Sequence, residues 1–593
     1  MHKLKKFLAG LIAVSAIVGG VSIPVNAENI SDFSNYGTGY IPFGEEEAER
    51  FFESTSEDSS EFRLQSNSGV RTSFPSSVDL SQSSYFPPIG YQGSLGSCMS
   101  WASTYYQFTY EAHKLNNITT TYDNSYSPRW TFNFTNYGYN HGTNFTSVYN
   151  VLTLQGAATM AEAPYDANNY DYSWINNESV MVNALKTRMT SSSNVFLNTN
   201  THQITSKTDS DLDALKQKLN DGKVLSVGVI SNGGLGNWST ETTTSGETAV
   251  YRASYNAGEN AENGGHALVI VGYNDNIECD FNGNGTIEES EKGAFKLANS
   301  WGTGFGNNGF IWVMYDALNY VSANTTNNWE AGKPATRTAI FDRNGGSNNI
   351  VTSINVANQT VNLAAVVNFT SNDCHHIQFF TNRSTGNTGY NENSAYLAKN
   401  VFNPFEDTQE VPTSFSGAFA LDFGTLDDNI VNYLWGYNWY VRMHNRSSSY
   451  SATLSSYKLV DDKCNIVRNS NISPMYMWAD GIRTPSMMLY LQLGDVDYNG
   501  TLTSDDSQSI LQYMVNLCDF SSLQKVLADV DQDGDIDIVD VLTLNQSMLQ
   551  NNQITTEEIE RMLTEYHDYV AEVGIETIQD FYEYFSMNDV GVQ

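Results

Sequence analysis

The stretch Gln92-Gly93-Ser94-Leu95-Gly96-Ser97-Cys98 places a glutamine six residues before a cysteine, with small residues between them. Apolar and aromatic residues follow it, Met99 and Trp101 among them. This pattern predicts a turn that leads into the N-terminus of a helix. The exposed amide groups and the dipole of a helix N-terminus lower the pKa of a thiol there and favour the reactive thiolate. Cys98 is therefore either an inert core residue, as most single cysteines are, or a nucleophile.

Two later segments supply what a thiol nucleophile needs. Gly264-Gly265-His266 opens the apolar run Ala267–Gly272, which predicts a buried strand with an imidazole at its start. Another predicted strand leads into Asn299-Ser300-Trp301. A thiol needs a base to accept its proton, and that base needs a group that orients its ring. Cys98, His266 and Asn299 supply these parts in a suitable order.

These segments resemble the papain-like cysteine proteases. Residues 92–98 are similar to the family's Q-G-S-C-G-S-C, residues 263–273 to its H-A-V-x-x-V-G-Y block, and residues 299–310 to its N-S-W-G-x-x-W-G-x-x-G-Y. The resemblance covers about residues 73–335 and implies an α+β papain-like fold that hydrolyses proteins or peptides. It also implies one role for each matching residue: Gln92 lines the oxyanion hole, Cys98 is the nucleophile, His266 is the general base and acid, Asn299 orients the imidazole, and Trp301 shields that hydrogen bond.

Two departures from the family pattern lie beside the nucleophile. Leu95 stands where the family often has a disulfide cysteine, and Met99 separates Cys98 from the tryptophan that usually follows the nucleophile directly. The alternative to an active peptidase is a catalytically weak papain fold that serves as a binding or adhesion subunit. The intact set of cysteine, histidine, asparagine and glutamine argues against that alternative, because a decayed site would be expected to lose one member.

The N-terminus predicts export from the cell. Residues 1–27 have a basic start, an apolar run and a small-x-small ending at Ala27, which together indicate a secretory signal peptide. The apolar run is short and Pro24 follows it closely, so a membrane anchor is disfavoured, and no later stretch is apolar enough to span a membrane. We therefore expect a secreted, extracellular protein, bound to a bacterial cell surface or scaffold. Residues 28–72 are polar and predict a flexible leader or propeptide, with no long amphipathic helix that would block a cleft.

Charge and cysteine content narrow the function classes. The formal net charge is −36, and removal of the three signal-peptide lysines makes it −39. So acidic a protein lacks the basic surface that nucleic acids and anionic membranes require. Five cysteines in 593 residues do not form a disulfide framework, and the odd number leaves at least one unpaired within the chain. The sequence leaves open whether Cys374 and Cys464 form a disulfide bridge.

Residues 336–485 contain short β-rich runs separated by clusters of Asn, Ser, Gly and Thr. Regular turn signals between short strands predict a β-sandwich domain. The segment loosely resembles the lectin-like domains that accompany some papain-like peptidases. The resemblance implies that this domain either binds carbohydrate or braces the peptidase.

An acidic loop that begins at Asp495 recurs 34 residues later at Asp529. Both copies place oxygen-bearing side chains at positions 1, 3, 5 and 12 around a glycine at position 6, as calcium loops do. Each copy precedes a helix-like run, and two such helices are too small to fold confidently without metal, so we expect two calcium ions to supply folding free energy. The predicted ligands are Asp495, Asp497, Asn499, Thr501, Asp506, Asp529, Asp531, Asp533, Asp535 and Asp540.

This repeat, at about residues 490–552, resembles the dockerin type I-like modules, small all-α calcium-binding domains that bind cohesin domains on cellulosome scaffolds. The resemblance implies a cohesin partner. In that family the residues just before the last ligand help to select the partner, and here these are Ser504, Asp505, Ile538 and Val539. The alternative is a purely structural calcium module. Residues 553–593 predict an acidic helical tail.

A third candidate calcium loop lies between His266 and Asn299. It offers Asp280, Asn282, Asn284, the Thr286 carbonyl and Glu291, with Gly285 at the sharp turn. The alternative is a polar hairpin rich in Asn and Gly. No cofactor is expected for the chemistry itself.

Overall fold

The structure is a computed structural model that describes part of the chain. The predicted signal peptide at 1–27, most of the leader, and Asn282 lie outside the described residues. Those described are 39–41, 74–195, 204–230, 238–254, 265–280, 283–318, 337–338, 343–344, 348–349, 351–385, 413–423, 429–470, 472–478, 480–565 and 567–588.

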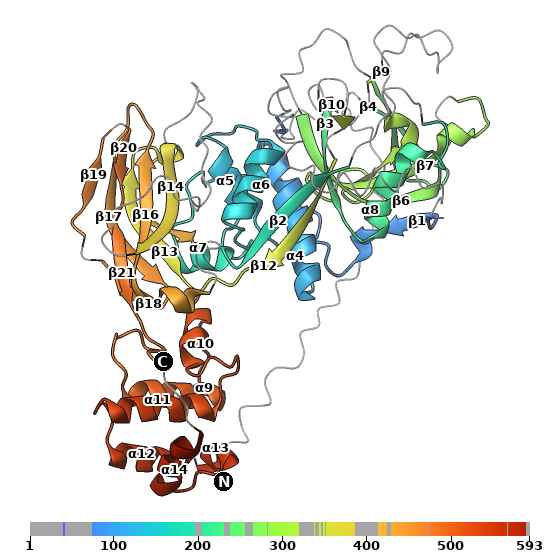
Figure 1. Cartoon of the computed structure of the whole chain (residues 1–593). Helices are drawn as coiled ribbons and strands as arrows, with labels where there is room; N and C mark the ends of the chain where they lie inside the picture. The colour runs from blue at the N-terminus through green and yellow to red at the C-terminus, as the bar shows by residue number, and fades with distance from the viewer. Residues whose placement is uncertain are drawn as a thin grey trace, which may run out of the picture.

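A ten-stranded sheet forms one half of the peptidase region (Figure 1). Its centre is the antiparallel pair β6 (Gly265–Glu278) and β7 (Lys292–Ala298), and β3 (Leu225–Ile230) lies on the other side of β6. The apolar runs that predicted buried strands lie at this centre, where Val227, Val269 and Leu297 have no exposed surface. The remaining strands are β1 (Ser77–Asp79), β2 (Thr187–Asn194), β4 (Trp238–Thr242), β5 (Thr248–Ser254), β8 (Phe310–Met314), β9 (Arg337–Thr338) and β12 (Val351–Asn358).

Helices form the other half of the peptidase region. A continuous helical segment runs from α3 (Cys98–Ser100) through a π-helical stretch (Trp101–Phe108) into α4 (Thr109–Asn116). It packs against β6, which brings the start of α3 to the start of that strand. The other helices in this region are α5 (Pro128–Thr135), α6 (Phe145–Leu154), α7 (Glu178–Ala184) and α8 (Asp213–Asn220).

The peptidase sheet continues beyond the boundary predicted at residue 335. Strand β12 pairs antiparallel with β2 along most of its length and with the start of β3. The predicted boundary therefore falls within this sheet, and β12 belongs to the peptidase rather than to the β-rich domain predicted at residues 336–485. Pairing between strands some 160 residues apart leaves no local sequence pattern from which it could be predicted.

Two antiparallel sheets follow, packed face to face. One contains β13 (Ala364–Ser371), β15 (Phe415–Asp422), β17 (Ala452–Val460), β18 (Ile466–Asn469) and β19 (Met475–Met477). The other contains β14 (Ile377–Thr385), β16 (Trp435–Asn445), β20 (Gly481–Arg483) and β21 (Ser486–Tyr490). Phe379 stacks on Phe419 across the layers at 5.1 Å, and Tyr457 Oη donates to the Trp439 carbonyl at 3.0 Å. Two short strands, β10 (Arg343–Asn344) and β11 (Asn348–Asn349), pair separately.

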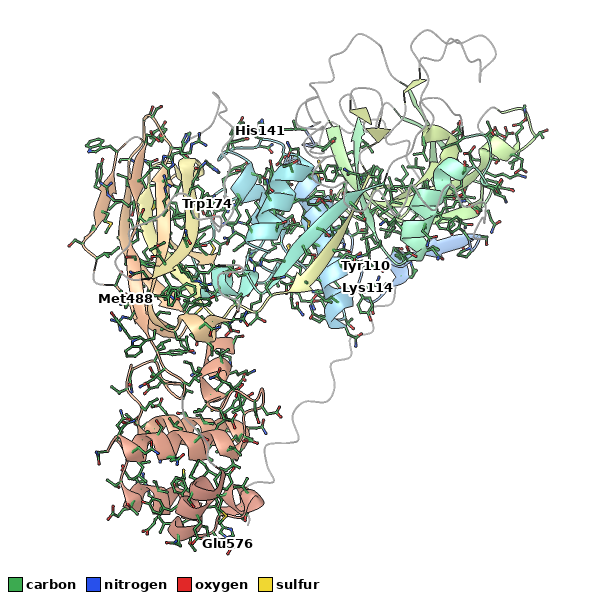
Figure 2. All side chains as sticks on the ribbon, in the orientation of Figure 1. Tyr110, Lys114, His141, Trp174, Met488 and Glu576 are labelled. Atoms are coloured by element: carbon green, nitrogen blue, oxygen red, sulfur yellow. The ribbon has the colours of Figure 1, made fainter. Side chains whose placement is uncertain are left out.

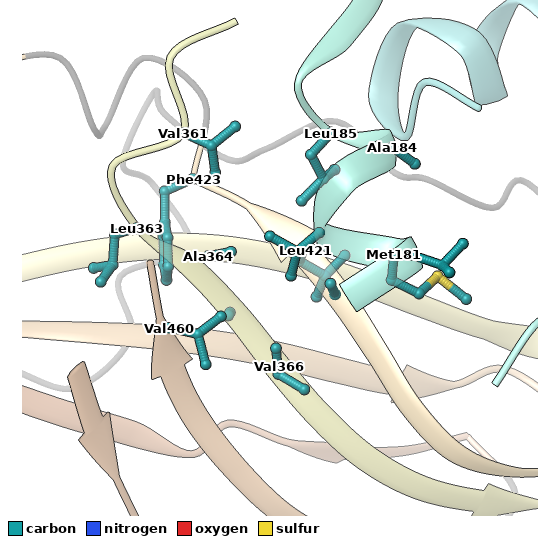
Figure 3. Close-up of a cluster of buried hydrophobic side chains, with 14 of the residues drawn as sticks. Met181, Ala184, Leu185, Val361, Leu363, Ala364, Val366, Leu421, Phe423 and Val460 are labelled. Carbon is teal, nitrogen blue, oxygen red and sulfur yellow. The ribbon is translucent and has the colours of Figure 1, made fainter. Parts of the chain in front are cut away.

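The helical side of the peptidase packs onto this β-rich domain. Side chains of α7, Met181 and Ala184 among them, lie against Leu421 and other apolar side chains of the first sheet (Figure 3). Trp174 sits between the two parts (Figure 2), with its ring 5.8 Å from Phe419. The interface also holds ion pairs, such as that between Lys458 Nζ and Glu178 Oε2 at 2.7 Å. The β-rich domain and the peptidase therefore share one continuous apolar core.

The C-terminal helices lie below the β-rich domain (Figure 1). Polar bonds from the loop after β17 fix them there: Lys463 Nζ meets Asp519 Oδ2 at 2.6 Å and Tyr498 Oη donates to Asp461 Oδ2 at 2.9 Å. The helices are α9 (Ser504–Met514), α10 (Ser522–Ala528), α11 (Ile538–Gln550), α12 (Thr556–Glu565), α13 (His567–Val570) and α14 (Ile578–Asn588).

Two chain-wide features complete the fold. All five cysteines carry free thiols, so Cys374 and Cys464 are not bridged. In the described part of the chain, no helix combines the length and apolarity needed to cross a membrane.

Replacement of Trp174 by alanine should destabilise the protein strongly. The side chain is 3% exposed and contacts aromatic rings of both parts, so its loss leaves a cavity in the shared core. We expect the free energy of unfolding to fall by about 3–5 kcal/mol, measured by urea denaturation. Trp478→Ala is the matched control, because that side chain is 74% exposed and should change stability by less than about 0.5 kcal/mol. Equal effects of the two variants would contradict the shared core.

Candidate active site

Cys98 is the first residue of α3, and hydrogen bonds hold the turn that precedes it. The Gln92 main-chain amide donates to the Ser300 carbonyl at 2.8 Å, and Gln92 Nε2 donates to the Leu95 carbonyl at 2.8 Å. The Gly96 amide donates to Asn140 Oδ1 at 2.6 Å. Leu95 is buried. Packing and these bonds therefore fix the turn without the disulfide that the papain-like family often has there.

His266 and Asn299 meet across the paired strands β6 and β7. His266 lies near the start of β6 and Asn299 directly follows β7, so their side chains approach across the end of the ladder. His266 Nε2 lies 2.9 Å from Asn299 Oδ1, and Asn299 Oδ1 also accepts from the Ser300 amide at 2.7 Å. His266 Nδ1 is buried and makes no hydrogen bond to any described residue. This orientation leaves Nδ1 as the nitrogen that can accept a proton from a thiol.

Trp301 covers the imidazole as the resemblance implied. The two ring centroids lie 4.6 Å apart with an interplanar angle of 30°. Trp301 is itself buried and packs edge-on against Phe305 at 5.2 Å. An apolar cover of this kind strengthens the hydrogen bond beneath it by excluding water.

Gln92 is fully buried, and its carboxamide is held in one orientation. Its Oε1 accepts from Ser300 Oγ at 2.5 Å while its Nε2 faces the turn before Cys98. Preorganised donors beside a nucleophile can stabilise the charge that develops on a carbonyl oxygen. The structure therefore brings Gln92, Cys98, His266 and Asn299 into one region at the junction of helices and sheet.

Burial shifts both titrating groups toward their neutral forms. It raises the pKa of the Cys98 thiol to about 11, an effect opposed in part by main-chain amides of Ala267, Gly39, Tyr40 and Met99. Burial also lowers the pKa of His266 to about 4, opposed by its hydrogen bond to Asn299. While both side chains are buried in this way, the thiolate of Cys98 and the imidazolium of His266, which papain-like chemistry uses, are disfavoured.

A short part of the leader causes some of this burial. Residues 39–41 lie against the site, where the Tyr40 amide donates to the Gly265 carbonyl at 3.0 Å. The Ile41 amide donates to the Thr143 carbonyl at 3.0 Å, and the Thr143 amide donates to the Gly39 carbonyl at 2.8 Å. The sequence offered no helix that would cover a cleft, and the cover observed here is three residues of extended chain.

Two tyrosines that sequence reasoning did not single out as site residues support the catalytic groups. Tyr106 Oη accepts from the Gly90 amide at 2.9 Å and donates to the Asn299 carbonyl at 2.8 Å. Tyr165 Oη donates to the Gln92 carbonyl at 2.9 Å and lies 2.6 Å from Ser97 Oγ. Tyr165 is the last residue of the motif Glu162-Ala-Pro-Tyr, which is only a weak sequence signal for a site residue. Tyr106 lies in the helical run after Cys98, and no sequence signal marks it as a site residue.

The two C-terminal acidic loops gather carboxylates at single points. Oxygen atoms of Asp495, Asp497 and Asp506 lie within 4.8 Å of one another, and so do those of Asp529, Asp531 and Asp533. Oδ1 of Asp495 and Oδ1 of Asp529 are buried without a hydrogen-bond partner among the described residues. Buried carboxylate oxygens without donors are costly unless a cation neutralises them. The donor set therefore fits calcium.

The two loops share their internal geometry. Asp506 Oδ1 accepts from the Val496 amide at 3.0 Å and Asp540 Oδ1 from the Val530 amide at 2.7 Å, so position 12 closes both loops in the same way. Gly500 and Gly534 have φ of +84° and +99°, a backbone conformation that residues other than glycine disfavour. The other predicted ligands, Asn499, Thr501 and Asp535, donate or accept turn bonds within their own loops.

The four predicted partner-contacting residues differ in exposure. Asp505 is exposed, while Ser504 and Val539 are half-buried. Ile538 is only 4% exposed and packs into the apolar core. A partner would therefore contact Asp505 at the start of α9 and Val539 at the start of α11 more readily than Ile538.

The loop at 280–291 has a weaker arrangement of donors. Asp280 accepts from the amides of Gly283 at 2.8 Å and Gly285 at 2.8 Å, and Asn284 Oδ1 accepts from the Thr286 amide at 2.7 Å. Within the described residues of this loop, Glu291 included, no three carboxylates converge as they do in the C-terminal loops. Its ligand set is therefore less preformed than theirs.

Residues 74–328 match the family model described as papain family cysteine protease. The match confirms the predicted peptidase domain. The chain thus carries a papain-family cysteine protease domain and is a papain-like peptidase that hydrolyses peptide bonds. None of the curated proteins matches the chain.

Solved cysteine proteases are among the similar structures. Xylellain from Xylella fastidiosa is 19% identical, with 54% of this chain and 96% of that chain covered and a TM-score of 0.33. The proform of the ragweed pollen allergen Amb a 11 is 16% identical, with coverages of 53% and 77% and a TM-score of 0.30. Procathepsin L2 from the larval midgut of Tenebrio molitor is 18% identical, with coverages of 54% and 79% and a TM-score of 0.31.

Replacement of Asn299 by alanine should slow the chemical step. The His266 imidazole would lose the acceptor that fixes its Nε2, and misplaced acid–base groups cost about 10²–10⁴-fold in rate. We expect kcat on a peptide substrate to fall by about 10²-fold with little change in KM. Asn276→Ala, at an exposed position of β6, serves as the control and should leave kcat unchanged. A larger change in KM than in kcat would contradict an orienting role.

Proposed function

We propose that this chain is a secreted cysteine endopeptidase that works through Cys98, His266 and Asn299 and attaches to a cohesin-bearing scaffold through a calcium-dependent dockerin module. The observation that carries the catalytic part is the 2.9 Å contact between His266 Nε2 and Asn299 Oδ1. It aims the opposite nitrogen away from Asn299 and so makes it available to the thiol at the start of α3.

The reaction proceeds in two steps. The Cys98 thiol gives its proton to His266, the resulting thiolate attacks the peptide carbonyl, and the His266 imidazolium then gives that proton to the leaving amine. A water molecule, deprotonated by His266, then hydrolyses the thioester and regenerates the thiol. The side-chain amide of Gln92 and the Cys98 main-chain amide stabilise the oxyanion in both steps.

The alternative hypothesis is a papain fold that has lost most of its activity and serves as a binding or adhesion subunit of the same assembly. The two readings differ in the reactivity of Cys98. An active site holds the thiol as a thiolate at mildly acidic pH, where ordinary cysteines remain protonated.

Active-site labelling should therefore separate the two. Once the leader is displaced, iodoacetamide or an epoxide inhibitor at mildly acidic pH should modify Cys98 at least ten times faster than Cys464 or Cys518, as measured by peptide mass spectrometry. His266→Ala should remove that advantage, because the Cys98 thiol would lose the base that accepts its proton. Equal labelling of all accessible thiols would support the inactive fold.

The docking part of the proposal rests on the duplicated acidic loops. Their matching closures at Asp506 and Asp540, and their two groups of converging carboxylates, support two calcium ions. The loops are not equivalent in their surroundings, because Tyr498 of the first loop bonds to Asp461 of the β-rich domain. A cohesin partner would therefore meet one copy more openly than the other.

Calcium titration of the full chain tests both sets of loops. We expect two equivalents from the C-terminal loops, with Asp495→Ala and Asp529→Ala each removing one, as measured by calorimetry. The double variant should also lose capture by immobilised type I cohesin. A third equivalent that disappears in Asp280→Ala would belong to the loop at 280–291. Asp519→Ala, outside every loop, is the control, and unchanged calcium binding in the double variant would refute the assignment.

The β-rich domain fits a bracing role, with carbohydrate binding as the other proposal. Bracing is supported by the buried contacts of Trp174 and α7 with the first sheet. Carbohydrate binding is supported by the exposed aromatic pair Trp435 and Tyr490, whose rings lie 5.2 Å apart. Exposed aromatic rings offer the apolar faces on which sugars can stack.

A further inference from the structure

The C-terminal tail packs on the second copy of the calcium-loop repeat. Asn545, near the middle of α11, is completely buried and lies between two other helices. Its Oδ1 accepts from Ser507 Oγ of α9 at 3.2 Å, and its Nδ2 donates to Met562 Sδ of α12 at 3.0 Å. Helix α11 therefore has the first copy of the repeat on one side and the tail on another (Figure 1).

The burial pattern of α11 shows that more than one of its faces is covered. The five consecutive residues Val541–Asn545 each have at most 2% of their surface exposed. One turn of an α-helix takes about 3.6 residues, so five successive side chains point in every direction around the axis. A surface helix normally buries one stripe and exposes the rest. Along this stretch α11 is instead buried on all sides.

The first copy provides an internal comparison, because each residue of α11 has a counterpart 34 positions earlier in α9. Helix α9 buries Ile510 and Leu511 and exposes Gln512, as a one-sided helix does. Gln508 is half-buried, whereas its counterpart Leu542 is completely buried. The second copy thus carries an apolar residue where the first is polar, and it is the second copy whose helix meets the tail.

The tail supplies the apolar surface that covers this helix. Its buried side chains belong to the same apolar cluster as those of α11, and they include Ile559, Met562, Leu563, Phe581 and Phe585. The tail also reaches the second loop: burial, and then the carboxylates of Asp537 and Asp531, raise the pKa of Tyr584 in α14. The tail therefore extends from the start of α11 to its middle.

From this arrangement we infer that the tail is an intrachain cover for the second copy, and that a scaffold partner docks in one orientation, on the first copy. The inference rests on the docking function proposed for the duplicated loops. It adds which of the two copies is available and what blocks the other. A partner could reach the covered face of α11 only by displacing the tail from it.

The surface that remains for a partner is polar. Asp505 at the start of α9 and Gln512 further along it are exposed, and Gln508 between them is half-buried. The bond from Tyr498 to Asp461 holds the first copy at its loop, and Asp505 stays exposed all the same. The two copies are thus held within the chain in different ways, the first by its loop and the second by its helix.

The first test measures whether α11 holds the tail, and it needs no partner. Arg561 is the one basic cleavage site for trypsin in residues 553–593, and cleavage there requires α12 to open locally. In the full chain with calcium, Leu542→Gln should raise the rate of cleavage after Arg561 at least tenfold, because it places an amide in the apolar contact. Leu517→Gln, at a leucine that is 76% exposed, should change that rate less than twofold. Equal cleavage of Leu542→Gln and the parent chain would overturn the inference.

Leu542→Gln gives the second copy the residue that the first copy already tolerates, so the repeat should stay folded and bind two equivalents of calcium by calorimetry. If that variant loses calcium binding, Asn545→Leu replaces it. This second variant also installs the residue of the first copy, Leu511, and it removes the bond to Met562. It should raise cleavage after Arg561 to the same extent, and unchanged cleavage would again overturn the inference.

The second test asks which copy a partner contacts, with immobilised type I cohesin as the probe. Asp505→Val and Val539→Asp exchange the corresponding residues of the two copies, and neither residue is a predicted calcium ligand. In the full chain, Asp505→Val should weaken capture at least tenfold, whereas Val539→Asp should change it less than twofold. Both variants should keep two equivalents of calcium. Equal losses of capture in the two variants would overturn docking on the first copy alone.

The two proposals fail in different ways. Protection of Arg561 that depends on Leu542, without capture by cohesin, would sustain the cover and refute the docking function. Capture that depends equally on both copies, with Arg561 cleaved freely in the parent chain, would sustain docking and refute the cover.

Discussion

The antiparallel ladder between β6 and β7 is the constraint on which the site depends. It sets the distance between a histidine at the start of one strand and an asparagine at the end of the other, and their side chains then bond at 2.9 Å. The same strand, β6, receives the helical segment that begins at Cys98. A catalytic group from each half of the peptidase is therefore positioned by one pair of strands whose centre is completely buried.

Local sequence patterns predicted the parts of the fold that depend on near neighbours. The apolar run at Ala267–Gly272 forms a strand, and the turn before Cys98 leads into a helix. The acidic loops also lead into helices where their spacing indicates, because the aspartate at position 12 is the third residue of each helix and its side chain accepts from the N-cap amide. In each case the decisive interactions lie within about a dozen residues, where period and turn chemistry are visible.

Contacts over long separations could not be predicted in this way. Tyr106 and Tyr165 support the site through hydroxyl groups whose partners lie far along the chain. Tyr40 belongs to a polar leader without periodicity, and its burial depends on space that Gly228 and Gly265 leave. Ile538 occupies a position typical of partner contacts, yet packing makes it part of the core. Each of these outcomes depends on tertiary packing that a single sequence does not encode locally.

Strand β12 has a consequence for how the polypeptide can be divided. It completes the peptidase sheet between β2 and β3, and the chain then runs directly into β13 of the next domain. A fragment that stops at residue 335 would leave two strands with unsatisfied main-chain groups, the kind of open edge that promotes aggregation. The smallest fragment that completes the peptidase sheet must therefore run to the end of β12 at Asn358, and the apolar side chains of α7 that it would expose are covered by the β-rich domain in the full chain.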